Sequence, residues 1–320
     1  MEKKAAFVGS GLIGTGFAVN ALMNGWTVYL RPRKNVEQAQ KRVEDGLNFF
    51  VSCGALSKDD YEDALKRLFV TTDLKEAVDG AVFIQESVPE KLDLKQEIIA
   101  EIEELVPADV VIATSASGLL VTDIFAKAKH PERGVGGHPY HPAYLIPLVE
   151  IVKGEKTEDV YAQKAKEFYA AIGKKPVILN KEVVGYIANR FQSAIHRELV
   201  ELVTNGVCSV EDADQAMTYG VGLRWAIMGQ GLTLHLGAAP EGLGGFTKKY
   251  NMQPGQVNRR MDALAKWGVF PTDDWDKQLE KGVLEEIEHR DESMGKDMES
   301  IENWRDKMLV EILKVQGILK

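Results

Sequence analysis

The sequence predicts an α/β fold, in which a largely parallel sheet carries helices on both faces and is followed by an all-α C-terminal domain. In the first half, short apolar runs without polar alternation recur, and longer segments with apolar residues at helical spacing separate them. Beyond about Lys181 the strand-like runs disappear and only helical patterns continue. A length of 320 residues fits about two domains, and we place their boundary between residues 183 and 184. Residues 1–183 would then form the sheet domain, and residues 184–320 the helical domain.

The individual elements follow from the same patterns. Strands are expected at the apolar runs Ala5–Val8, Thr27–Leu30, Phe69–Thr71, Ala81–Gln85 and Val110–Ala113. Leu92–Leu105, with apolar residues at helical spacing, is expected to be a helix between the last two strands. In the second half, helices are expected at Ile187–Thr204, Val210–Tyr219 and Ser293–Lys314. The acidic stretch 284–302 is expected to be a solvated helix face.

Composition and charge exclude several classes of protein. Hydrophobic residues make up 45% of the chain, so it can bury a core and is not disordered as a whole. The net charge of −9 offers no basic surface for nucleic acid, and the chain contains no run of about 18 apolar residues that could cross a membrane.

The N-terminus weakly resembles a secretory leader, but Gly9 interrupts its apolar stretch, so we interpret it as the first strand. Cys53 and Cys208 form neither a disulfide framework nor a zinc motif, which favours a cytoplasmic protein.

A glycine-rich turn directly follows the first predicted strand and opens a helix. It reads Gly9-Ser10-Gly11-Leu12-Ile13-Gly14. In such a turn the first glycine allows the tight bend, the second lets the backbone approach a pyrophosphate, and the third lets the helix pack closely. The helix N-terminus adds free N–H groups and a partial positive charge. The pattern predicts a Rossmann-type dinucleotide-binding domain, with cofactor contacts from Gly9, Gly11, Leu12, Ile13 and Gly14.

The end of the second predicted strand bears on which dinucleotide is bound. It reads Leu30-Arg31-Pro32-Arg33-Lys34, and no carboxylate occurs before Glu37. Sites that select NAD usually carry an acidic residue there, whereas guanidinium groups suit the 2′-phosphate of NADP. The sequence therefore favours NADP over NAD, with Arg31 and Arg33 as candidate contacts. The alternative is that these residues are only surface cations.

Three polar patches are expected at the carboxyl ends of the strands, the usual ligand-binding edge of an open α/β sheet. They are residues 113–118, 137–142 and 148–151. Glu150 lies alone in an apolar stretch and needs a partner to remain a carboxylate, and His138 is the natural one. A His oriented by a carboxylate can accept a hydroxyl proton while a hydride leaves, although a structural role for His138 is the alternative. His138 and His141 could also be metal ligands, but prolines interrupt them and no third ligand is apparent, so no metal is expected.

Taken together, these motifs resemble the 3-hydroxyacyl-CoA dehydrogenase family, in the family's order and over nearly the whole chain. The resemblance is carried by the glycine turn, Glu86–Glu90, Ser117, His138–Pro142, Leu148–Glu150 and Gly185–Arg190. It implies that His138 and Glu150 form a proton-transfer dyad, and that Ser117 and Asn189 hold the substrate oxygen and the dyad geometry. It also implies that Glu90 and Lys95 lie near the cofactor. The chain departs from the family in having His141 where Asn is common and in lacking the acid after the second strand, which puts an inherited NAD preference in doubt.

Two further segments are similar to one branch of that family, which contains L-carnitine dehydrogenase and lambda-crystallin (L-gulonate 3-dehydrogenase). They are Gln85–Lys95 and Gly220–Gly229. That branch acts on small free 3-hydroxy acids and not on CoA thioesters. Arg224, in an otherwise apolar run, is expected to face a cleft and bind the carboxylate of a small anionic substrate. It could instead pair with Asp212 or Asp214.

The substrate remains open between carnitine-like and sugar-acid-like molecules. Carnitine would require an aromatic cage for its quaternary ammonium group. Aromatic residues are available for such a cage at Trp225, Phe246, Tyr250 and Trp267, but aromatics at helical spacing are more often core.

The sequence thus predicts an NAD(P)-dependent dehydrogenase that interconverts the 3-hydroxyl and 3-keto forms of a small 3-hydroxycarboxylic acid. One alternative is a 3-hydroxyacyl-CoA dehydrogenase that acts on substrates such as 3-hydroxybutyryl-CoA. An alternative of another class is a non-catalytic, crystallin-like structural protein. The resemblance also implies a homodimer formed through the helical half.

Overall fold

The computed structural model describes residues 3–226, 229–237, 281–282, 284–285 and 287–319. Contacts divide the chain into two compact units, Met1–Arg190 with Asp306–Lys320, and Phe191–Arg305. The C-terminal residues therefore group with the sheet unit. The boundary that the sequence places between residues 183 and 184 stays a prediction.

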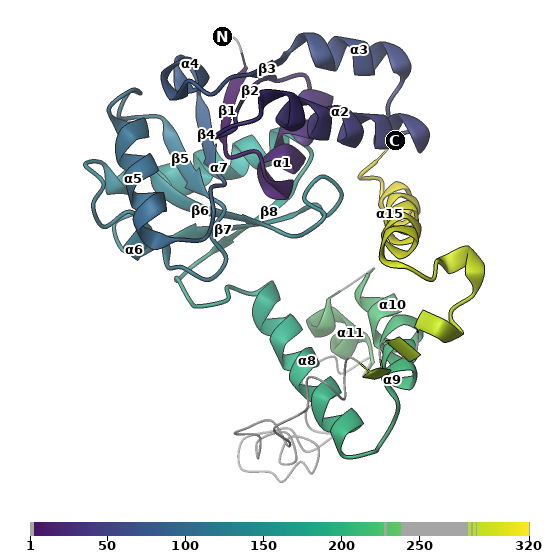
Figure 1. Cartoon of the computed structure of the whole chain (residues 1–320). Helices are drawn as coiled ribbons and strands as arrows, with labels where there is room; N and C mark the ends of the chain where they lie inside the picture. Colours follow the sequence, from purple (N-terminus) through teal and green to yellow (C-terminus); the bar gives the residue numbers. More distant parts are fainter. Residues whose placement is uncertain (1–2, 227–228, 238–280, 283, 286, 320) are drawn as a thin grey trace. The chain divides into compact units, whose positions relative to one another are not determined.

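The first unit is built on one eight-stranded sheet with the order β3-β2-β1-β4-β5-β6-β7-β8 (Figure 1). Strands β1 to β6 pair in parallel, β7 pairs antiparallel with β6, and β8 is parallel to β7. The order of the first six strands is that of doubly wound dinucleotide-binding folds. The strands are β1 (Lys4–Val8), β2 (Thr27–Arg31), β3 (Leu68–Val70), β4 (Phe83–Glu86), β5 (Val111–Thr114), β6 (Gly134–Pro139), β7 (Leu148–Lys153) and β8 (Lys175–Leu179).

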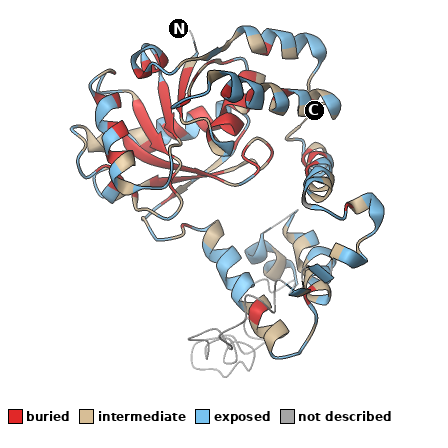
Figure 2. Ribbon diagram, viewed as in Figure 1, coloured by how far each residue is buried: buried red, intermediate tan, exposed pale blue. Residues whose placement is uncertain are grey.

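Helices cover both faces of this sheet, as predicted. Alternate residues of β1 enter different cores, Ala5 and Phe7 on one face and Ala6 and Val8 on the other. The first core includes residues of α1, α2, α3, α7 and the end of α15, and the second includes residues of α4, α5 and α6. Figure 2 shows the central strands of the sheet buried between these two layers, whereas the edge strands β3 and β8 carry exposed residues. The helices of this unit are α1 (Leu12–Met23), α2 (Val36–Ser52), α3 (Lys58–Lys66), α4 (Leu74–Val78), α5 (Leu92–Glu103), α6 (Val121–Ile124), the 3₁₀ turn η1 (Pro131–Arg133) and α7 (Asp159–Ala171).

The five predicted strands are confirmed as β1 to β5, with ends that differ by at most two residues. No bounds were predicted for strands β6, β7 and β8, although strand ends were expected at residues 137–142 and 148–151, and β6 does end within the first of these segments. In β6, three glycines and a terminal proline lower the strand propensity. The interpretation of residues 148–151 as the carboxyl end of a strand is wrong, because β7 begins at Leu148 and runs against β6. Since an antiparallel strand starts at the edge where its neighbour ends, Glu150 still lies at the carboxyl edge of the parallel strands.

The second unit is helical in the part that the structure describes, and no strand occurs there. A capping box between Ser209 and Asp212 starts α9. The helix expected over 293–314 is confirmed only from Met298, where α15 begins, and the acidic stretch 284–302 is not one helix, because a 3₁₀ turn interrupts it. None of the described helices is both long and apolar enough to span a membrane. The remaining elements, of which α8 begins and α15 ends in the first unit, are α8 (Ala188–Thr204), α9 (Val210–Ala216), the π-helical turn η2 (Met217–Val221), α10 (Gly222–Trp225), α11 (Gln230–Leu236), the 3₁₀ turn η3 (Glu292–Met294) and α15 (Met298–Val315).

Candidate active site

The glycine turn between β1 and α1 has the geometry of a phosphate cradle. Gly9 has a φ of +115°, and a Cβ there would lie 2.4 Å from the carbonyl oxygen of Ser87. A Cβ on Gly14 would lie 1.9 Å from the carbonyl oxygen of Gly9, whereas one on Gly11 would meet nothing within 4 Å. The first and third glycines are thus required by close backbone contacts, and the second borders open space. Because the N-cap Gly11 has no side chain, the first N–H groups of α1 are left for an anion, which fits the pyrophosphate of a dinucleotide.

Arginines lie beside this turn. The carbonyl oxygen of Arg31, the last residue of β2, accepts the N–H of Gly9 at 2.9 Å, and its side chain donates to the carbonyl oxygen of Thr72 at 3.2 Å. Arg33 is exposed two residues further on. Sequence reasoning missed Arg42 of α2, whose guanidinium donates to the carbonyl oxygen of Ser10 at 2.8 Å. A surface arginine within a helix carries no sequence signal for such a contact.

His138 and Glu150 are directly opposite one another in the β6–β7 register. Nδ1 of His138 lies 2.9 Å from Oε2 of Glu150, and both residues are buried, at 5% and 0% exposure. The other carboxylate oxygen accepts the N–H groups of Ile187 and Ala188, each at 2.9 Å, at the start of α8. Burial alone would raise the pKa of Glu150, but the hydrogen bonds from His138, Ala188 and Ile187 outweigh it and lower that pKa below its usual range.

An ionised Glu150 determines what the imidazole can do. A carboxylate only accepts hydrogen bonds, so Nδ1 of His138 must carry the proton that it donates. In the neutral ring, Nε2 is then the acceptor, which is the form that a general base requires.

The segment before α8 is held in an uncommon backbone conformation. Gly185 has a φ of +76° and Tyr186 a φ of +47°. For a bulky residue such as Tyr186, this conformation costs on the order of 1–3 kcal/mol. It turns the chain so that the next two N–H groups, those of Ile187 and Ala188, reach Glu150. The buried ring of Tyr186 lies 5.2 Å from the ring of His138, measured between centroids.

A second polar pair lies next to the dyad. The side-chain amide of Asn189 donates from Nδ2 to Oγ of Ser117 at 2.9 Å. Tyr140, which sequence reasoning did not select, donates from its hydroxyl to Oδ1 of Asn189 at 2.7 Å. Its ring centroid also lies 5.2 Å from that of His138. The structure therefore brings together the four residues expected to be catalytic, with Tyr140 between the two pairs.

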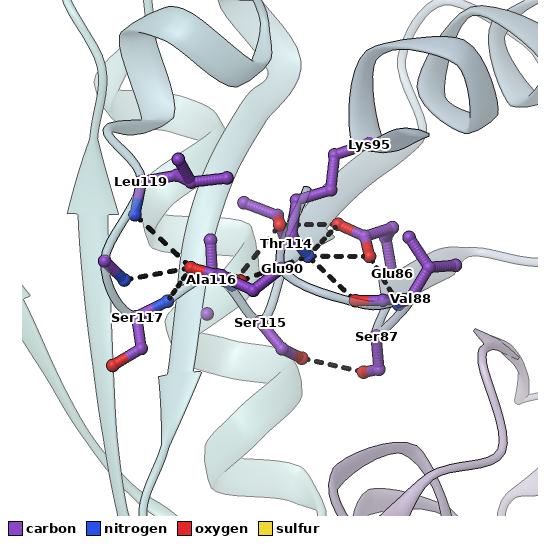
Figure 3. Close-up of polar contacts among 12 residues, drawn as sticks. Glu86, Ser87, Val88, Glu90, Lys95, Thr114, Ser115, Ala116, Ser117 and Leu119 are labelled. Carbon is purple, nitrogen blue, oxygen red and sulfur yellow. Dashed lines mark hydrogen bonds and ion pairs between the residues drawn. The ribbon is translucent and has the colours of Figure 1, made fainter. Parts of the chain in front are cut away.

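Glu90 holds the loop that carries Ser117 (Figure 3). Its Oε1 accepts the consecutive N–H groups of Ser117, Gly118 and Leu119, at 2.9, 2.9 and 3.3 Å. Partial burial would raise the pKa of Glu90, but the N–H groups of Gly118 and Ser117 and the charge of Lys95 lower it. The carboxylate of Glu90 thus fixes the backbone of the Ser117 loop.

Lys95 joins this loop to β4 through a buried ion pair. Its side chain is 1% exposed, and Nζ lies 2.9 Å from Oε1 of Glu86 and 3.7 Å from Oε2 of Glu90. The hydroxyl of Thr114 donates to the other oxygen of Glu86 at 2.6 Å. These contacts are made within the protein, so a contact of Glu90 or Lys95 with the cofactor stays a prediction.

Arg224 belongs to the second unit and is exposed in the short helix α10. In the described part of the chain it forms no ion pair with Asp212 or Asp214, and Asp212 instead accepts from the hydroxyl of Ser209.

Among the aromatic cage candidates, the indole N–H of Trp225 donates to Gln230, and Phe246, Tyr250 and Trp267 lie outside the described residues. Over the described ranges, no three His, Cys, Asp or Glu side chains gather as a metal site would require.

Models of one protein family match most of the chain. The model described as "3-hydroxyacyl-CoA dehydrogenase, NAD binding domain" matches residues 4–183, and that of the family's C-terminal domain matches residues 185–277. The chain belongs to the 3-hydroxyacyl-CoA dehydrogenase family. It is therefore an oxidoreductase that acts on a CH–OH group and uses a nicotinamide cofactor. The predicted fold class and family are confirmed.

Several similar proteins carry the name L-carnitine dehydrogenase. The one from Mesorhizobium japonicum is 40% identical over 77% of this chain and 68% of its own length. The one from Pseudomonas putida is 37% identical over 98% of this chain and 93% of its own length. The one from Streptomyces coelicolor is 35% identical over 99% and 96%, respectively. The resemblance to the branch that contains this enzyme is thus confirmed.

Solved structures show the same fold. A 5-formyl-3-hydroxy-2-methylpyridine-4-carboxylic acid 5-dehydrogenase, described as an NAD⁺-dependent dismutase, matches with a TM-score of 0.75. It is 24% identical, and 98% of each chain is covered. The 3-hydroxybutyryl-CoA dehydrogenase of Escherichia coli matches with a TM-score of 0.64 and 28% identity, over 79% of this chain and 53% of that chain.

Proposed function

We propose that this protein is an NAD(P)-dependent dehydrogenase of the L-carnitine dehydrogenase type, which interconverts the 3-hydroxyl and 3-keto forms of a small free 3-hydroxy acid. The observation that carries this proposal is the buried His138–Glu150 pair at the same sheet edge as the glycine turn. The names of relatives that are 33–40% identical support the substrate class.

The chemistry assigned to the chain's own residues is proton transfer and orientation. Nε2 of His138 accepts the hydroxyl proton of the substrate, and the carbon–oxygen bond becomes a carbonyl as hydride leaves that carbon. The acceptor for this hydride would be supplied by an oxidised nicotinamide bound at the glycine turn. Glu150 stabilises the imidazolium that forms, because its carboxylate is buried and 2.9 Å from Nδ1. Ser117 and Asn189 provide polar groups for the reacting oxygen. In the reverse direction, the imidazolium returns the proton to the new alkoxide.

For the cofactor, we propose a preference for NADP(H). Arg31 ends β2 and is joined by its backbone to Gly9, so its side chain starts beside the phosphate cradle. The acid that would accept hydrogen bonds from the ribose hydroxyls of NAD is missing, whereas Arg31 and Arg33 could bind a 2′-phosphate.

For the substrate, we propose that Arg224 binds the carboxylate group. Arg224 is an exposed residue and makes no ion pair with Asp212 or Asp214 in the described residues. Because the protein carries a net charge of −9, an anionic substrate needs a local cation of this kind.

The same proposal includes a homodimer and a cytoplasmic location, and the two free cysteines are compatible with a reducing compartment.

A turnover screen tests this function. L-carnitine, a panel of short free 3-hydroxy acids and 3-hydroxybutyryl-CoA are each offered with NAD⁺ and with NADP⁺, and nicotinamide reduction is followed. We expect oxidation of at least one free acid with a higher kcat/KM than that of the thioester. Turnover of the thioester alone would support the acyl-CoA alternative. Cofactor binding without turnover of any substrate would support the crystallin-like alternative.

A further inference from the structure

We propose that Tyr140 is a positioning residue, which fixes the direction of the Asn189–Ser117 hydrogen bond so that the hydroxyl proton of Ser117 is kept for the substrate oxygen. This inference rests on the proposed function, since it assumes that Ser117 contacts the reacting oxygen. It adds to that function a role for Tyr140, a residue that lies in the histidine motif but to which neither the motif nor the family resemblance assigned a role.

The three side chains form one directed chain of hydrogen bonds. The hydroxyl of Tyr140 donates to Oδ1 of Asn189 at 2.7 Å, and Nδ2 of Asn189 donates to Oγ of Ser117 at 2.9 Å. The oxygen of an amide only accepts and its nitrogen only donates, whereas a hydroxyl has a single proton to give. With its Oγ already accepting from Asn189, Ser117 can direct its own proton to another acceptor.

The opposite orientation of the amide would have a different consequence. Oδ1 of Asn189 would then face Ser117, and the serine would donate its only proton to Asn189. The substrate oxygen would lose this donor at the stage of the reaction where negative charge builds up on it. A donor at Oδ1 selects against that orientation, and Tyr140 is placed to be this donor.

The phenol of Tyr140 is well suited to a fixed donor role. Partial burial and the negative charge of Glu150 raise the pKa of Tyr140 well above its usual range, so it keeps its proton at neutral pH. Its ring also packs beside His138, at a centroid distance of 5.2 Å and an interplanar angle of 73°. An experiment must therefore separate the effect of the hydroxyl from the effect of the ring.

A double-mutant cycle makes this separation. Tyr140→Phe keeps the ring and removes the hydroxyl, and it should lower kcat for oxidation of the free 3-hydroxy acid by about 10-fold, while the cofactor Kd stays within about twofold. In an Asn189→Ala background, Tyr140→Phe should change kcat by no more than about twofold, because no amide remains to be oriented. An equal loss in both backgrounds, or no loss in the native background, would overturn the proposal.

Tyr61→Phe is the matched control. The hydroxyl of Tyr61 in α3 also contacts an asparagine, Asn48 of α2, at 3.3 Å, but neither residue contacts the dyad. Its removal should leave kcat within about twofold of the native value. A loss comparable to that of Tyr140→Phe would show that removing any such hydroxyl impairs the fold, and would count against the proposed role.

A second measurement does not depend on turnover. The side-chain amide signal of Asn189, identified in ¹H–¹⁵N NMR spectra by its absence from Asn189→Ala, should shift in Tyr140→Phe and in Ser117→Ala but not in Tyr61→Phe. A signal that Tyr140→Phe leaves unmoved would overturn the proposal, even in an active enzyme. If the native protein oxidises no 3-hydroxy acid, the proposed function is refuted, and the amide signal still decides whether Tyr140 orients Asn189.

Discussion

Replacing Glu150 by Gln tests the dyad most directly, because it removes a charge and leaves the shape of the side chain nearly unchanged. Oxidation of the substrate would create an imidazolium at His138, whose Nδ1 lies 2.9 Å from the Glu150 carboxylate. For charge centres roughly 4 Å apart and an effective dielectric constant near 20, this attraction amounts to about 4 kcal/mol. Loss of that term corresponds to a fall in kcat of roughly 10³-fold.

The hydrogen-bond pattern makes the loss more severe. In the native site one carboxylate oxygen accepts the N–H groups of Ile187 and Ala188, and the other accepts Nδ1–H of His138. Glutamine has only one accepting oxygen, so if this oxygen stays on the two backbone groups, its NH₂ group faces His138. The imidazole of His138 must then accept a hydrogen bond at Nδ1 and carry its proton on Nε2. Because Nε2 is already protonated, it can no longer accept the hydroxyl proton of the substrate.

Steady-state kinetics of alcohol oxidation, with cofactor Kd and Tm measured alongside, would check this prediction. Glu182→Gln is the matched control, because Glu182 also accepts backbone N–H groups, those of Val121 and Thr122, but does not touch His138. We expect it to retain kcat within about threefold. A folded Glu150→Gln variant that binds cofactor and turns over at a similar rate to the native enzyme would refute the assignment of the dyad.

Three further predictions concern the cofactor site and the pH dependence of stability. Gly14→Ala should lower Tm sharply, because its Cβ would lie 1.9 Å from the carbonyl oxygen of Gly9. Gly11→Ala should keep the native Tm and weaken cofactor binding, because its Cβ would meet nothing within 4 Å. Equal effects of the two substitutions on Tm would contradict this difference. Arg31→Asp should weaken the binding of NADPH relative to that of NADH by at least about 10-fold, measured as the ratio of the two Kd values. A native protein that binds both cofactors with equal Kd would disprove the NADP preference. The pKa of Glu90 is lower in the folded protein than in the unfolded chain, so its ionised form stabilises the fold at pH values above the pKa that Glu90 has in the unfolded chain. This contribution is lost as the pH falls through the lower pKa that Glu90 has in the folded protein. In urea unfolding, the gap in free energy of unfolding between the native protein and Glu90→Gln should therefore shrink from pH 6 to pH 3, and a constant gap would argue against this linkage.

The parts of the fold that could be predicted depend on local signals. The strands β1 to β5 are short apolar runs, and the glycine turn has a fixed spacing after the first of them. The range of strand β6 was not predicted because its glycines serve packing: a Cβ on Gly137 would lie 1.8 Å from the hydroxyl of Tyr169 in α7. The reversed direction of β7 is set by its pairing with β6, which no local pattern in the chain reveals.

The same distinction applies to the site. His138 and Glu150 are 12 residues apart and lie on paired neighbouring strands, so an isolated acid near a histidine was a usable signal. Tyr140 and Asn189 are 49 residues apart, and the hydroxyl of an aromatic residue beside the histidine motif carries no indication of its partner. The contact of Arg42 with Ser10 depends likewise on the packing of α2 beside the glycine turn.

The loops of this site are positioned by charge more than by apolar packing. In residues 115–122 and 182–188 only three residues are buried, namely Ala116, Val121 and Tyr186. Their consecutive backbone N–H groups are instead accepted by carboxylates: those of Glu90 and Glu150, which lie outside both segments, and that of Glu182, which belongs to the second segment and accepts from the first. A carboxylate has two accepting oxygens and no donor, so it can collect several converging N–H groups where an amide or hydroxyl would leave one opposed. The geometry of Ser117 and His138 therefore depends on Glu90 and Glu150 staying ionised, and the lowered pKa values of these two glutamates meet that condition.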